Sequence, residues 1–93
     1  MMIGTLQVEL LLTESFSLKD KRFVLQSLKQ KIRSGFNVSV AEVDYQEKWQ
    51  RSLLAFACVS AERRGIDSLF SRVLNAIHAE SRVEVVDQRV DVW

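Results

Sequence analysis

Positively charged side chains are concentrated in one short segment, where they could bind phosphate groups. Residues 18–34 hold six cations and one acid, while the chain of 93 residues has a net charge of only +1. On a helix over this segment one stripe, here called the basic stripe, carries Lys19, Arg22, Lys29 and Arg33. Cations in a row can follow a phosphate backbone, which predicts contact with phosphate or RNA. The alternative is a solvated helix face. Phe23, on the solvent side of the stripe, could stack on a base.

A second candidate site combines the start of this helix with a distant tryptophan. Lys19, Lys21 and Arg22 follow the predicted helix start, and Trp49 and Arg51 lie in and beside a polar connection. A helix N-terminus, fixed cations and an indole are typical of anion-binding sites. All five residues are therefore candidate phosphate or RNA contacts. The alternative is that Trp49 caps the end of the core.

Other reactive residue types occur without the partners that catalysis or metal binding needs. Cys58 is the only cysteine and has no adjacent His or basic residue, so we expect a buried, unreactive thiol. His78 has no further ligands at metal-site spacing, and Glu42 with Asp44 is more typical of surface acids. Three widely spaced glycines exclude a phosphate-binding loop. We therefore expect a non-enzymatic protein with no catalytic residue, no metal and no small-molecule cofactor.

The N-terminal residues argue against export and against a membrane anchor. Residues 1–9 contain no basic region, and Gln7 and Glu9 interrupt the apolar stretch. A lone cysteine fits a reducing compartment. We expect a cytoplasmic protein with no membrane partner.

Apolar spacing predicts four strands and two helices. Alternation indicates strands over residues 2–12, 36–45 and 86–92, and a nearly continuous apolar run indicates a central strand over residues 52–61. Helical spacing indicates helices over residues 18–34 and 66–80. Ser17 is the expected N-cap of the first helix and Gly35 its left-handed C-cap. A bulge is expected near Val40.

The order β-α-β-β-α-β predicts one α+β domain over residues 1–93, with the ferredoxin-like plait as its fold. Right-handed crossovers give a four-stranded antiparallel sheet in the order 4-1-3-2, with both helices on one face. This topology places the first helix start, the 46–50 connection and the turn after the second helix at one end. We therefore expect Lys19–Arg22, Trp49, Arg51 and Arg82 to be neighbours.

The third strand is apolar on both faces, so one face of it is a candidate interface. Small residues suit close helix packing, which places Ala55, Ala57 and Val59 under the helices and Leu54 and Phe56 on the open face. An uncovered apolar patch indicates a partner. The alternative function is therefore a protein-interaction or homodimerisation domain, unless long side chains cover this face.

Three motifs in order resemble a known family. They are Ser17–Arg22 (SLKDKR), Phe36–Val43 (FNVSVAEV) and Trp49–Arg51 (WQR). Together they resemble the YlxP-like family of small bacterial proteins of unknown function. The resemblance implies a cytoplasmic ferredoxin-like domain with no established enzymatic activity, often encoded beside transcription and translation factors. That setting associates the family with RNA or the ribosome.

Overall fold

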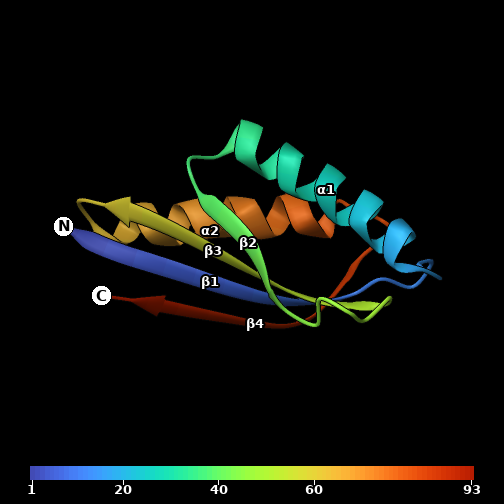
Figure 1. The fold of residues 1–93 in the computed structure, drawn as a ribbon. Coiled ribbons are helices and arrows are strands. Elements are labelled where there is room, and N and C mark those ends of the chain that lie inside the picture. The colour runs from blue at the N-terminus through green and yellow to red at the C-terminus, as the bar shows by residue number, and fades with distance from the viewer.

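The computed structural model describes all 93 residues and contains four strands and two helices. In chain order they are β1 (Met2–Leu11), α1 (Leu18–Gly35), β2 (Ser39–Asp44), β3 (Arg51–Ser60), α2 (Arg63–His78) and β4 (Glu84–Val92). All strand pairs are antiparallel, and the sheet order is β2-β3-β1-β4. Both helices cover one face of the sheet (Figure 1). The predicted ferredoxin-like plait and its strand order are confirmed.

Helix α1 begins where the sequence predicts, but it ends differently. The Ser17 hydroxyl accepts a hydrogen bond from the Asp20 amide at 3.0 Å, and the Asp20 carboxylate accepts one from the Phe16 amide at 3.1 Å. At the other end, Gly35 does not adopt a positive φ angle. The extended residue Phe36 caps the helix instead, and its amide donates to the Ile32 carbonyl at 2.9 Å. The predicted left-handed cap at Gly35 is wrong.

One apolar core lies between the sheet and the helices. It contains 15 buried side chains, of which one is Leu12 after β1 and the others come from β1, β2, β3 and both helices. Close packing depends on Gly4 in β1, because a Cβ atom there would lie 2.5 Å from Cγ2 of Ile66 in α2. The glycine therefore sets how closely α2 approaches the sheet.

The prediction that Leu54 and Phe56 lie on the open face is wrong. Both side chains are buried beneath the helices, and the face away from the helices carries Ala55, Ala57 and Val59. The larger side chains fill the space between the sheet and the helices, which small ones would leave void. The bulge expected near Val40 also lies elsewhere, where the β2–β3 register shifts between Glu42 and Asp44.

The two ends of the molecule differ in what they contain. One end, here called the loop end, holds the β1–α1 loop, the β2–β3 loop and the α2–β4 turn, as predicted (Figure 1). The opposite end holds both chain termini and is called the terminal end (Figure 1). The charged candidate residues therefore lie at the loop end and along α1.

Candidate functional site

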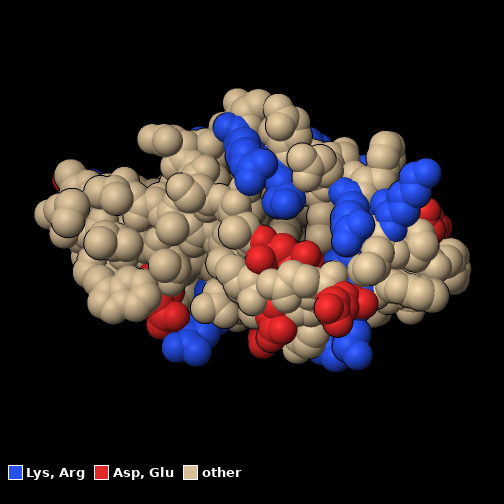
Figure 2. Space-filling view, in the orientation of Figure 1, with Lys and Arg blue, Asp and Glu red and all other residues tan.

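The basic stripe lies along α1 on the side that faces β2. Arg33 shows this orientation directly, because its guanidinium donates to the Val40 carbonyl in β2 at 3.2 Å. Lys19 and Arg22 are exposed and Lys29 is half-buried. With a helical rise of about 1.5 Å per residue, Arg22, Lys29 and Arg33 follow one another at about 10 Å and about 6 Å along the axis. Figure 2 shows Lys and Arg side chains over α1.

Acidic side chains border the basic stripe. In Figure 2 they lie below α1, over β2 and the loop that follows it. The acids of this stretch are Glu42, Asp44 and Glu47. A polyanion would be attracted to α1 and repelled by this neighbouring edge of the sheet. The surface therefore restricts an anionic partner to the outer side of the helix.

Lys21 is a structural residue, and the prediction that it contacts phosphate is wrong. Its side chain is only 1% exposed, and its ammonium pairs with the Glu42 carboxylate at 2.9 Å. The same ammonium donates to the Tyr45 carbonyl, and the buried Ser52 hydroxyl donates to Glu42 at 2.6 Å. Lys21 thus joins α1 to β2 and to the residue after it.

The sequence did contain a signal for this burial. Lys21 stands four, seven and eleven residues before the three buried side chains Leu25, Leu28 and Ile32. This spacing places it on the apolar side of α1, since such intervals repeat on one helix face. A lysine there indicates a buried cation that must find a partner.

Arg51 is engaged on the open face of the sheet. Its guanidinium pairs with the Glu9 carboxylate and lies over the Tyr45 ring, with Cζ at 4.5 Å from the ring centroid. The hydrogen bond and the charge of Glu9 raise the pKa of Arg51. Trp49 is exposed beside it, where the β2–β3 loop meets the end of β1. Arg51 therefore carries a compensated charge.

Arg82 is also held by a carboxylate, on the other side of the loop end. Its Nε and Nη2 donate to the two oxygens of Glu80 at 2.6 and 3.1 Å, and Nη2 donates to the Ser27 hydroxyl at 3.4 Å. These hydrogen bonds lower the pKa of Glu80. The guanidinium carbon lies 6.0 Å from the centroid of the exposed Phe23 ring. The turn before β4 is thereby fixed against α1.

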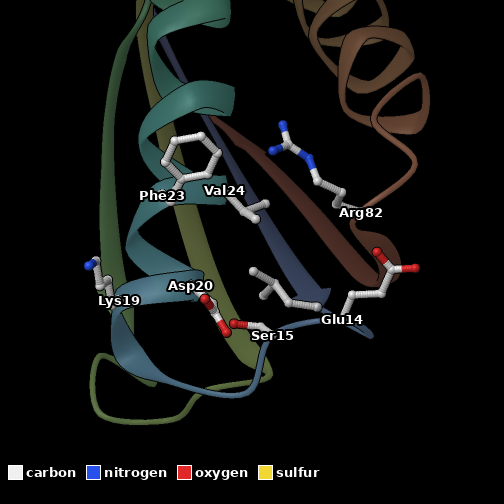
Figure 3. Close-up of a pocket in the computed structure, with 8 residues that line it drawn as sticks. Glu14, Ser15, Lys19, Asp20, Phe23, Val24 and Arg82 are labelled. Carbon is white, nitrogen blue, oxygen red and sulfur yellow. The ribbon is translucent and has the colours of Figure 1, made fainter.

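The predicted neighbours do not form one surface. Lys21 and Arg22 line neither of the two depressions at the loop end, and the other four are divided between them. The first has a volume of about 360 Å³ and is lined by Leu12, Glu14, Ser15, Lys19, Asp20, Phe23, Val24 and Arg82 (Figure 3). The second has a volume of about 430 Å³ and is lined by Leu11, Glu47, Lys48, Trp49, Gln50 and Arg51. They share no lining residue. A hydrogen bond from the Gln50 amide to the Ser15 carbonyl, at 3.0 Å, links the loops that form them.

The remaining reactive residue types do not assemble into a chemical site. Cys58 is buried as predicted, and burial raises the pKa of its thiol. No cluster of three or more His, Cys, Asp or Glu side chains is arranged to hold a metal ion. Neither helix is sufficiently long and apolar to span a bilayer.

An exposed apolar row lies on the open face at the terminal end. Ile3 is paired with Val59 across β1 and β3, and it exchanges two backbone hydrogen bonds with Trp93 at 2.9 and 2.8 Å. The side chains of all three residues are exposed. Sequence reasoning missed this row, although Val59 stands on the strand face opposite to Leu54 and Phe56. We call Ile3, Val59 and Trp93 the terminal row.

Solved structures with a similar arrangement show the fold alone. A designed protein, "De novo designed protein Foldit4", aligns with a TM-score of 0.58 and 14% identity, covering 98% of this chain and 97% of that one. A putative chlorite dismutase aligns with a TM-score of 0.58 and 15% identity, covering 99% of this chain and 44% of that one. These likenesses support the ferredoxin-like plait.

Sequence comparison gives the family. The chain is 36% identical over 83 residues to "Uncharacterized protein YlxP" of Bacillus subtilis (strain 168), covering 89% of this chain and 90% of that protein. Residues 3–90 match the family described as "Protein of unknown function (DUF503)". The likeness to YlxP seen in three sequence motifs is thus confirmed, and the chain belongs to the DUF503 family.

Proposed function

We propose that the protein is a non-enzymatic binding module that contacts RNA, free or in the ribosome, through the basic stripe of α1. One observation carries the proposal. The six ion pairs of the chain use other cations: Lys21, Arg51, Arg63, Arg64, Arg82 and Arg89. All four cations of the basic stripe therefore lack a carboxylate partner, and so does Lys31 on the same helix.

Unpaired cations on one helix suit a polyanion better than a single small anion. Each contact with a phosphate releases a condensed counterion, which makes binding strongly dependent on salt. The axial spacing of the stripe extends over several turns of α1, so successive cations can contact successive phosphates. The acids beside β2 keep the polyanion over the helix. These features favour recognition of a backbone over recognition of sequence.

The test compares charge reversal on and off the stripe. Fluorescence anisotropy would measure the affinity for labelled RNA between 50 and 200 mM salt for the unmodified protein, for Arg22→Glu/Lys29→Glu and for Lys48→Glu/Arg72→Glu. The second pair is the matched control, because it changes the net charge equally and also removes cations outside the six ion pairs. We expect the affinity of the stripe variant for RNA to fall at least about tenfold. The slope of log K against log salt should become shallower by about 1.4, because two phosphate contacts are lost.

Two outcomes would contradict the proposal. The first is that the unmodified protein does not bind RNA even at low salt. The second is that the two double variants weaken binding equally, which would show that binding depends on the net charge of the protein and not on the basic stripe. Co-sedimentation of the same variants with ribosomes distinguishes free RNA from assembled ribosome as the target.

A second candidate function is self-association through the open face of the sheet, and the terminal row favours it. Ile3, Val59 and Trp93 form a continuous exposed apolar surface, and the neighbouring Ala55 and Ala57 allow another sheet to approach closely. At the usual strand spacings, the open face of a sheet of four strands of up to ten residues has an area of about 600 Å² in each copy. Specific interfaces bury at least about 1,200 Å² in total, counted over both partners. Two such faces are therefore large enough to form a dimer of this chain.

Sedimentation velocity across a concentration series tests this second candidate. We expect reversible dimers that are weakened by Val59→Ser and retained by Val90→Ser, a matched change at an exposed valine of β4 that pairs with Leu6 and so lies on the face toward the helices. A strict monomer at every concentration would refute self-association. Equal behaviour of the two variants would exclude the terminal row as the contact.

A further inference from the structure

We infer that the depression between Phe23 and Arg82 holds one unpaired base, so that the RNA is single-stranded. This inference rests on the proposed function and deepens it, because it names the kind of RNA and a base-binding site. The depression lies next to the start of the basic stripe, and Lys19 belongs to both (Figure 3). Its volume of about 360 Å³ lies at the lower end of the range of small-ligand pockets.

Phe23 presents an aromatic ring where the core does not use it. Its side chain is 71% exposed, although it stands on a helix whose buried face is already complete. Figure 3 shows Phe23 and Arg82 on facing sides of the depression, with Glu14 and Ser15 below them. An exposed ring in this position can stack on a base, and stacking is tolerant of sequence because every base has an aromatic face.

Arg82 is suited to hold a base and not a phosphate. Glu80 binds its guanidinium with two hydrogen bonds, so the positive charge is compensated and the plane is fixed before a ligand arrives. The guanidinium carbon is 6.0 Å from the Phe23 ring centroid. A planar guanidinium can stack on a base in the same way as an aromatic ring can. Phe23 and Arg82 thus offer a base two flat groups on facing sides of the depression.

The rest of the lining separates base from backbone. Leu12 and Val24 give an apolar floor, and the carboxylates of Glu14 and Asp20 stand at the rim. Carboxylates repel phosphate and accept hydrogen bonds from the N–H groups of a base edge. A strand whose phosphates follow Arg33, Lys29 and Arg22 would reach Lys19 with its next base beside the depression. Bases inside a duplex are stacked and paired, so they cannot enter.

The experiment measures the affinity of the full chain for one RNA sequence as a single strand and as a duplex. Fluorescence anisotropy at fixed low salt would compare the unmodified protein with Phe23→Ala, Phe23→Tyr and Phe16→Ala. Phe16 is the matched control, because it is 69% exposed and does not line the depression. Loss of one base stack is expected to weaken single-strand binding by about 5- to 150-fold in Phe23→Ala. Phe23→Tyr and Phe16→Ala should bind as the unmodified protein does, and Phe23→Ala should leave duplex binding unchanged.

The outcomes separate this inference from the proposed function. If Phe23→Ala retains single-strand affinity while Arg22→Glu/Lys29→Glu loses it, the stripe binds RNA and the base site is refuted. Duplex binding as tight as single-strand binding would also overturn the base site and leave the stripe intact. If the unmodified protein binds neither RNA, the proposed function fails and the base site fails with it. Circular dichroism of each variant confirms that the fold is retained.

Discussion

The loop end and the terminal end are held together by different interactions. At the loop end, charged and polar side chains connect separate elements: Lys21 with Glu42, Arg82 with the Ser27 hydroxyl, and Gln50 with the Ser15 carbonyl. At the terminal end, Gly4 allows Ile66 and Phe70 to pack closely against β1, while Val59 and Trp93 remain exposed. Loops with few apolar side chains depend on specific hydrogen bonds for their position, whereas adjoining strands and helices depend on packing.

This difference indicates which partners each end suits. The loop end and α1 offer fixed charges and an aromatic ring to a polar, anionic partner. The terminal row offers an exposed apolar surface to an apolar partner, and the terminal end is mostly tan on the face drawn in Figure 2. Changes that selectively weaken one end therefore test whether the two ends are energetically distinct.

The largest effect is expected from removing the buried cation of the loop end. Lys21→Ala should lower the free energy of unfolding by about 3 kcal/mol, because it leaves the Glu42 carboxylate unpaired. The Glu42 side chain is 17% exposed, so the loss should not exceed this lower end of the range for buried pairs. Urea denaturation measures it. Lys19→Ala is the control and should change stability by less than about 0.5 kcal/mol.

A double variant separates the unpaired charge from lost packing at Lys21. Lys21→Ala/Glu42→Gln should recover part of the stability, since no unpaired carboxylate remains. If Lys21→Ala costs no more than Lys19→Ala, the network does not stabilise the loop end as described.

The next effect is expected at the terminal end, where Gly4 allows close packing. Gly4→Ala places a Cβ atom 2.5 Å from Cγ2 of Ile66, so α2 must shift. We expect a loss of about 1–3 kcal/mol in the free energy of unfolding, measured in the same urea series. Gly35→Ala is the matched control, because no atom lies within 4 Å of the added Cβ. An equal response of the two glycines would show that α2 is not closely packed on β1.

The smallest effect is expected from acid at the Glu80–Arg82 pair. The folded pKa of Glu80 lies below its ordinary value of 4.5, so the pair stabilises the fold above that pH and loses this contribution as the pH falls through the folded pKa. Glu80→Gln should therefore cost up to about 1 kcal/mol at pH 7 and progressively less below about pH 4.5.

Urea denaturation between pH 7 and pH 3 measures this convergence. Asp67→Asn serves as the control, because its partner Arg63 and Asp67 itself are both more than half exposed. That variant should differ little from the unmodified protein at any pH. A Glu80→Gln difference that stays constant on acidification would contradict the assignment.

The fold could be predicted because each element has a distinct local pattern. Ser17 followed by Asp20 places the start of α1, and alternation in β1 separates Leu6, Val8 and Leu10 from the polar face. The open face of β3 could not be predicted in the same way, since both parities are apolar. Which side chains of β3 face away from the helices follows only from the register, which pairs Thr5 and Gln7 of β1 with Ala57 and Ala55.

The candidate site could be predicted only in part. The basic stripe follows from helix periodicity, which fixes the relative direction of side chains on α1. Which cations are already paired depends on contacts between distant segments, such as Arg51 with Glu9 and Lys21 with Glu42. The depression at Phe23 depends on the α2–β4 turn, whose position against α1 no local pattern specifies.

The burial of Lys21 has a consequence for chemical labelling. The chain has five lysines, and amine-reactive reagents modify an ammonium group only when they can reach it and it can lose its proton. Lys21 is the one lysine enclosed between α1 and β2, so it should resist acylation while the other four react. Its labelling rate, followed by mass spectrometry, would report how often α1 separates from the edge of the sheet.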